Sequence, residues 1–121
     1  MPRFVLLEHR RDGVHWDFML EHGDVLRTWA IDSPVVAGVD LPARALPDHR
    51  RIYLQYEGEI PGNRGTVRRV AEGSYTAEVW EEGRVRVRLH GTQLVGEVEI
   101  RQVVPASDGE PTWIFRMGNV D

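Results

Sequence analysis

The sequence contains no cysteine and no long apolar run, and these two absences exclude several classes of protein. Without cysteine there is no disulfide framework and no thiolate metal site, so a metal must be held by histidine, carboxylate or water. No stretch approaches the roughly 18 apolar residues of a membrane-spanning helix, and the start MPRFVLLEH lacks the apolar core and cleavage site of a signal peptide. We therefore expect a cytoplasmic protein with no membrane partner.

The length and composition predict one small folded unit. A chain of 121 residues is enough for one closed core, so we expect a single domain over residues 1–121, acting as a monomer. Hydrophobic residues make up 41% and charged residues 28%, which is typical of a folded soluble protein. The formal net charge of -4 argues against bulk electrostatic capture of nucleic acid but allows a local basic surface.

Apolar and polar residues alternate over short runs that are separated by glycine-containing turns, which is the pattern of half-buried strands. Strands are predicted near residues 3–9, 14–21, 24–31, 51–57, 65–72, 75–81, 84–90, 93–103 and 112–117. Only ARALPDH has room for a short helical turn, and the segment 33–50, with three of the seven prolines, is predicted to be a long ordered connection. The pattern favours an all-β, mostly antiparallel fold: a single closed or nearly closed β-barrel with little helix.

The stretch EHRRDGVHWDFMLE places polar side chains inside predicted strands. Residues i and i+2 of a strand share a face, so His15 and Asp17 project together, whereas Trp16, Phe18 and Leu20 project to the other face. The apolar face is the predicted core. The face with His15 and Asp17 is the candidate for a functional site.

The direction of His9 depends on the hairpin that follows it. A two-residue turn would pair His9 with Trp16 and aim it into the core, whereas a five-residue loop over 10–14 would pair it with His15. We favour the longer loop, which places His9, His15 and Asp17 on one surface. Two imidazoles and a carboxylate suit a divalent ion such as Mn²⁺ or Zn²⁺ with positions open for substrate oxygens; the same residues also fit the solvated face of an ordinary hairpin.

Two further segments carry polar groups at strand spacing. In DHRRIYLQYEG, His49, Arg51 and Tyr53 offer an imidazole, a guanidinium and a phenol for acid/base and anion-binding functions, and they also fit a loop histidine beside a packed tyrosine. In RVRVRLH, residues 84–90, three arginines share one face, as on a solvated sheet or a stripe that contacts phosphates.

Taken together, the segments resemble the 3'-phosphoesterase domain of bacterial and archaeal DNA ligase D, as a free-standing minimal version. The similar segments are FVLLEH and HWDFMLE with five residues between their histidines, VLRTWAI, DHRRIYLQYEGEIP, RLHGTQLVGEVEI and TWIFRM, in the family's order. The resemblance implies a β-barrel, manganese-dependent enzyme that heals DNA 3' ends in repair. Such an enzyme would remove a terminal 3' ribonucleoside as a phosphodiesterase and then the 3'-phosphate as a phosphomonoesterase.

Transferred position by position, the resemblance implies metal ligands at His9, His15 and Asp17 and phosphate-side residues at His49 and Tyr53. The expected cofactor is Mn²⁺, with Zn²⁺ or another divalent metal as the alternative. The expected partners are DNA or DNA/RNA 3' ends and a separate ATP-dependent DNA ligase or polymerase.

One position departs from the family pattern. An arginine usually follows the aspartate by two residues, and here that position is Met19. Arg51 and Arg11 are the candidates to replace its charge, and Arg44 is the nearest match to a second family arginine. The departure keeps open a catalytically weakened or inactive module that only binds nucleic-acid ends or a repair partner. A third interpretation takes His15, Asp17 and His90 as the iron triad of a barrel oxygenase.

Overall fold

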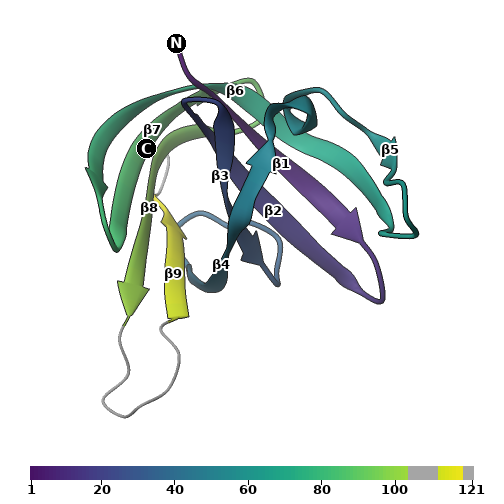
Figure 1. Ribbon diagram of the computed structural model, residues 1–121. Helices are drawn as coiled ribbons and strands as arrows, with labels where there is room; N and C mark the ends of the chain where they lie inside the picture. Colours follow the sequence, from purple (N-terminus) through teal and green to yellow (C-terminus); the bar gives the residue numbers. More distant parts are fainter. Residues whose placement is uncertain (104–111, 119–121) are drawn as a thin grey trace.

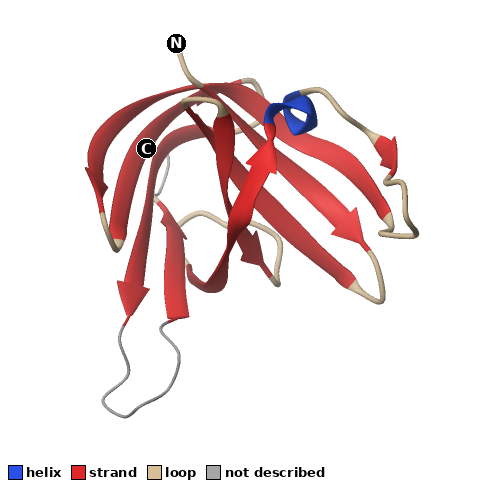
Figure 2. Ribbon diagram, in the orientation of Figure 1, coloured by secondary structure: helices blue, strands red, loops and turns tan. Residues whose placement is uncertain are grey.

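The computed structural model describes residues 1–103 and 112–118 and consists almost wholly of β-strands (Figures 1 and 2). The elements are β1 (Arg3–Arg10), β2 (Val14–His22), β3 (Val25–Ile31), β4 (Asp40–Arg50), η1 (Arg51–Leu54), β5 (Gly58–Glu59), β6 (Thr66–Glu81), β7 (Arg84–Gly91), β8 (Val95–Val103) and β9 (Thr112–Met117). Among the described residues the 3-10 turn η1 is the single helical element, and no helix there is long and apolar enough to cross a membrane.

The strands form one antiparallel sheet that closes on itself. The order is β1-β2-β3-β4-β9-β8-β7-β6, and β1 also pairs with β6, so eight strands make a ring; the short β5 adds to β6. Closure satisfies the backbone hydrogen bonds that open edges would expose. The predicted all-β, nearly closed barrel is confirmed.

The interior of the barrel holds the main core. Phe18 and Leu20 of β2 are fully buried there, and Trp16 is partly buried against the same cluster, as the alternation of this strand predicts. From β1, Phe4 and Leu6 project inward as well. The opposite residues of both strands therefore project out of the barrel.

A second apolar cluster covers that outer face. It consists of Val5, Leu7, Met19, Leu26, Leu54, Ile60 and Val67, with Tyr53 and Tyr56 partly buried against it. We call it the outer cluster. Because Leu54 belongs to η1 and Ile60 follows β5, the chain after β4 forms a cover over β1 and β2 (Figure 1). This cover, and not the barrel interior, encloses the polar face of the first hairpin.

The prediction of a long connection over 33–50 is wrong for its second half, and so is the helical turn at ARALPDH, because residues 40–50 form β4. The prolines suggested a loop, yet the two prolines of β4, Pro42 and Pro47, lie where only one neighbouring strand pairs. Pro42 pairs with β9 before the pairing with β3 begins at Ala43, and Pro47 lies at an irregularity of the β3–β4 ladder beyond the reach of β9. Proline is tolerated at such edge positions because no partner needs its missing N–H.

Two more predicted elements differ from the structure. The predicted strand at 51–57 is η1 and the turn after it, because Arg50 already pairs with Val25, the first residue of β3, so the sheet offers no further partner there. The predicted strands at 65–72 and 75–81 are one strand, β6. Gly73 continues it because its lack of a side chain lets the strand approach Gly91, whose Cα would lie 2.5 Å from a Cβ at position 73.

Candidate metal centre

The register of the first hairpin brings the three predicted metal ligands together. His9 pairs with His15 and Arg10 with Val14, so the hairpin loop consists of residues 11–13, with positive φ at Asp12 and Gly13. The predicted pairing of His9 with His15 is confirmed, and the alternative pairing of His9 with Trp16 is wrong. The predicted five-residue loop over 10–14 is wrong in length, because the pairing of Arg10 with Val14 extends the hairpin by one pair.

The ligand atoms of His9, His15 and Asp17 all lie within 4.8 Å of one another. His9 Nδ1 is 3.2 Å from His15 Nε2 and 3.5 Å from Asp17 Oδ2, and His15 Nε2 is 3.0 Å from Asp17 Oδ1. Ligand atoms about 2.1 Å from a common ion, at angles between octahedral and tetrahedral, lie about 3.0 to 3.5 Å apart. All three separations lie in this range, with Oδ2 of Asp17 nearer to His9 and Oδ1 nearer to His15.

A hydrogen bond on the far side of the ring fixes the orientation of His9. Its Nε2 donates to the backbone oxygen of Arg64 at 2.8 Å, and a carbonyl oxygen only accepts. The proton therefore resides on Nε2, and Nδ1 presents its lone pair to His15 and Asp17. Such an outer hydrogen bond is the usual means of setting the tautomer of a metal-binding histidine.

Asp17 is the most buried member of the group, with 2% of its surface exposed. Burial raises the pKa of its carboxyl group, while the nearby His15, His9 and His49 act in the opposite direction. Despite the short distance to His15 Nε2, the buried Oδ1 has no hydrogen-bond partner among the described residues. A buried carboxylate oxygen without a partner, beside two imidazole nitrogens, fits a divalent cation.

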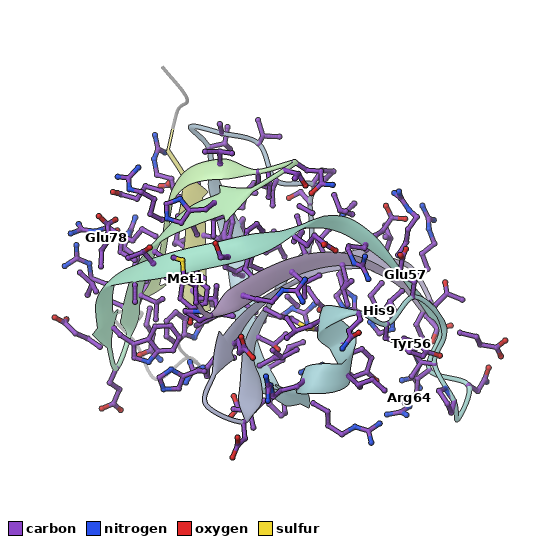
Figure 3. The ribbon with its side chains drawn as sticks, turned by 90° about the horizontal axis from the view of Figure 1, so that it is seen from above. Met1, His9, Tyr56, Glu57, Arg64 and Glu78 are labelled. Carbon is purple, nitrogen blue, oxygen red and sulfur yellow. The ribbon has the colours of Figure 1, made fainter. Side chains whose placement is uncertain are left out.

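The cluster borders a cavity of about 300 Å³ beneath the cover. The lining residues are His9, Arg11, Asp17, Met19, Asp48, His49, Arg50, Tyr53, Ile60, Arg64 and Val67. In Figure 3, His9, Tyr56 and Arg64 lie on the side of the barrel that carries η1, and Glu78 lies on the opposite side. The cavity thus brings the end of β4, η1 and the turn before β6 next to the first hairpin.

The predicted pair His49 and Tyr53 lines this cavity. His49 Nδ1 donates to the backbone oxygen of Pro47 at 2.8 Å, so Nε2 is the ring nitrogen left for a ligand. The two rings meet edge to face at 5.8 Å, and Tyr53 meets Tyr56 in the same manner at 5.9 Å. The contact between His49 and Tyr53 crosses the boundary between β4 and η1.

Arg51, the third residue predicted beside them, lies outside the lining of the cavity. Because residues 51–54 form a 3-10 turn, Arg51 and Tyr53 do not share a strand face as predicted. The guanidinium of Arg51 instead donates to Glu21 at 2.6 Å. A contact with a carboxylate leaves it less available to a phosphate.

Two other sequence patterns lie away from the cavity. The arginines of β7 pair with carboxylates across the sheet: Arg84 with Glu99, Arg86 with Glu78 and Arg88 with Glu97. These ion pairs fit the solvated sheet face and not a stripe of arginines that is free to contact phosphates. His90 pairs with Ser74 and lies 3.1 Å from the hydroxyl of Thr76, apart from the group formed by His9, His15 and Asp17.

Sequence reasoning missed three polar residues of the cavity, namely Asp48, Arg50 and Arg64. Asp48 and Arg50 flank His49, and that adjacency was the available signal. Arg64 follows the turn Pro61-Gly62-Asn63, and nothing in the sequence indicates that this turn meets the first hairpin.

Gly65 holds this turn against the hairpin, and we predict a large effect for Gly65→Ala. A Cβ at Gly65 would lie 2.0 Å from the backbone oxygen of Arg10, and the residue has φ +86°. We expect the variant to lose more than about 3 kcal/mol of unfolding free energy in urea and to bind Mn²⁺ about 10- to 100-fold more weakly, because Arg64 moves away from His9.

The matched control is Gly62→Ala. Gly62 has nearly the same φ, +84°, but the nearest atom to its Cβ is Arg64 Nε at 3.6 Å. It should lose only the 1 to 2 kcal/mol, roughly, of a left-handed alanine and keep its affinity for the metal. Equal losses in the two variants would contradict the role of the contact between Gly65 and Arg10.

The sequence of this chain is similar to that of known proteins. The family model described as "DNA Ligase D 3'-phosphoesterase domain" matches residues 7–102. The multifunctional non-homologous end joining protein LigD of Mycobacterium bovis is 33% identical over 102 residues, which cover 77% of this chain and 13% of that protein. The multifunctional non-homologous end joining DNA repair protein LigD of Mycobacterium tuberculosis matches with the same identity and coverage. The chain thus spans about one eighth of the length of these relatives.

Proposed function

Because the chain belongs to the DNA ligase D 3'-phosphoesterase domain family, we propose that it is a metal-dependent phosphoesterase that heals the 3' ends of DNA during repair. The reactions are removal of a 3' ribonucleoside as a phosphodiesterase and of a 3'-phosphate as a phosphomonoesterase. The observation that carries the proposal is the convergence of His9, His15 and Asp17 on one side of a cavity lined by His49 and Tyr53.

His9, His15 and Asp17 hold the metal in this proposal, with Mn²⁺ as the expected ion and Zn²⁺ or another divalent metal as the alternative. When bound, such an ion neutralises phosphate charge and lowers the pKa of water. The buried carboxylate of Asp17, on the outer face of the sheet, would supply the negative charge. The hydrogen bond from His9 Nε2 to Arg64 keeps Nδ1 of His9 available as the ligand atom.

His49 and Tyr53 act on the phosphate side. His49 donates its Nδ1–H to the Pro47 carbonyl, so Nε2 faces the substrate; in the imidazolium form Nε2 also carries a proton, which it can donate to a phosphate oxygen or transfer to the leaving oxygen. The phenol of Tyr53, held by its edge contacts, is a second hydrogen-bond donor for the same group.

The substrates in this proposal are DNA or DNA/RNA 3' ends, and a separate ATP-dependent DNA ligase or polymerase would use the healed end. Ligase and polymerase require a 3'-hydroxyl, and removal of the blocking group supplies it. We propose that the chain acts as a monomer, since the ring of strands and the site are both complete within one chain.

The test is phosphate release from a 3'-phosphorylated primer with Mn²⁺, compared between the wild-type chain and His49→Ala. The variant should lose about 10²- to 10⁴-fold in turnover, because it lacks the proton donor, while Mn²⁺ still raises its melting temperature as in the wild type. Unchanged turnover in His49→Ala would contradict the assigned role. A primer with a 3' ribonucleoside tests the phosphodiesterase step in the same assay.

A second candidate function is a binding module of the same fold with weak or no catalysis. Met19 favours it, because a fully buried thioether packs in the outer cluster where the family carries an arginine. Binding of 3'-phosphorylated ends without turnover in the presence of Mn²⁺ would select this function over the first.

A further inference from the structure

The arginines of this chain divide into two groups by their partners. All fifteen basic residues are arginine, and twelve of them approach a carboxylate within 4.0 Å. Arg11, Arg50 and Arg64 are the other three, and within residues 1–103 and 112–118 no carboxylate lies that close to them. These three guanidinium groups therefore have their charges available for another ligand.

All three of these arginines line the cavity beneath the cover, although they come from separate parts of the chain. Arg11 belongs to the loop between β1 and β2, Arg50 ends β4, and Arg64 lies in the turn between β5 and β6. The cavity has two carboxylates, Asp17 and Asp48. A divalent ion bound at Asp17 would leave an excess of positive charge, which favours an anionic ligand.

Two hydrogen bonds hold Arg64 in place, one of them to His9 of the candidate metal centre. Its backbone oxygen accepts the proton of His9 Nε2 at 2.8 Å, and its side-chain Nε donates to the backbone oxygen of Pro61 at 2.7 Å. A guanidinium has five N–H donors, so four remain on its two terminal nitrogens after this bond. Those nitrogens form the planar fork that suits two oxygens of one phosphate.

We propose that Arg64, supported by Arg11 and Arg50, is the phosphate-binding residue of this site and replaces the positive charge that Met19 lacks. The inference rests on the proposed function for the identity of the anion, a 3'-terminal phosphate. Binding at Arg64 does not require turnover, because an arginine fork binds the phosphate whether or not the phosphate is then hydrolysed. Arg51, which sequence reasoning proposed for this role, is already bound by Glu21.

The test uses the full chain with saturating Mn²⁺ and two fluorescent primers that differ only in a 3'-phosphate or a 3'-hydroxyl. Binding and phosphate release are measured for wild type, Arg64→Ala, Arg64→Lys and Arg101→Ala. Arg101 is the matched control, because it is also an exposed arginine but lies on β8 and pairs with Asp40 and Glu99. The Mn²⁺-induced rise in melting temperature is recorded for each variant.

Arg64→Ala should lose the preference for the 3'-phosphorylated primer and about 100- to 1000-fold in kcat/KM, as for removal of one preorganised donor. Arg64→Lys should recover part of the loss, because it keeps the charge without the fork. Arg101→Ala should resemble the wild type, and the Mn²⁺ effect on melting should persist in all four proteins.

The outcomes separate this inference from the proposed function. Turnover by the wild type with no loss in Arg64→Ala would overturn the inference and leave the enzyme intact. No turnover, with a 3'-phosphate preference that Arg64→Ala removes, would support the inference and overturn catalysis. Loss of the Mn²⁺ effect on melting in Arg64→Ala would also overturn the inference, because the residue would then act only through His9.

Discussion

His15→Ala should abolish manganese-dependent phosphate release from a 3'-phosphorylated primer, with a loss of more than about 1000-fold in kcat/KM. The variant removes one of the three proposed ligands and leaves His9 and Asp17 alone, which is too few for a specific divalent site. The metal contributes several kcal/mol of charge stabilisation to such a reaction, and every 1.36 kcal/mol is a factor of ten. The measurement is phosphate release over a range of Mn²⁺ concentrations.

His90→Ala is the matched control for that result. It removes an exposed imidazole whose neighbour is the hydroxyl of Thr76, outside the cavity. We expect normal turnover and a normal Mn²⁺ requirement. If the two variants were equally active, the metal centre would not be the site of reaction. A loss in His90→Ala alone, together with a requirement for iron and an oxo-acid, would instead support the oxygenase interpretation.

Asp17→Asn should have opposite effects on the metal-free and the metal-bound protein. Without metal and at a pH above its raised pKa, the wild type holds an ionised carboxylate that is 2% exposed and whose Oδ1 has no partner among the described residues. The amide removes that charge, so the variant should gain about 1 to 3 kcal/mol in unfolding free energy. Adding Mn²⁺ should stabilise the wild type and have little effect on the variant.

The gain in Asp17→Asn should also depend on pH, because burial raises the pKa of Asp17 above its ordinary value of 3.8. At pH values between 3.8 and the raised pKa, the folded chain retains a proton that the unfolded chain has released, so the wild-type stability falls as pH rises. The difference between variant and wild type should be near zero below pH 3.8 and should grow as pH increases through the raised pKa. Urea unfolding at several pH values, without metal, measures it.

Asp32→Asn is the matched control, because it also removes one carboxylate, an exposed one paired with Arg44. Its effect on stability should stay within about 0.5 kcal/mol at every pH. A metal-free Asp17→Asn protein that is less stable than the wild type at a pH above the raised pKa of Asp17 would show that the carboxylate is satisfied without a metal.

The first hairpin was predictable because its information is local. Alternation in VHWDFML fixes which residues of β2 face the barrel interior, and five residues between His9 and His15 allow the register that the structure adopts. Both depend on the period of a strand and the length of one loop. The same local logic recovered the strands on both sides of Glu82-Gly83.

The cover over the site was not predictable from local patterns. Residues 51–54 alternate like a strand, yet they form η1 because β3 has no residues left to pair with them. The proximity of Arg64 to His9 depends on the contact of the turn at Gly65 with Arg10, 55 residues away from it. The sequence around Arg64 gives no signal of this contact. The methionine at position 19 is explained only by the outer cluster, which the cover completes.

The central claim is that His9, His15 and Asp17 hold one divalent ion, and crystals soaked in manganese test it most directly. We predict a single anomalous-difference peak about 2.0 to 2.3 Å from His9 Nδ1, His15 Nε2 and an oxygen of Asp17. An empty position between these three atoms, at a Mn²⁺ concentration that saturates activity or raises the melting temperature, would contradict it.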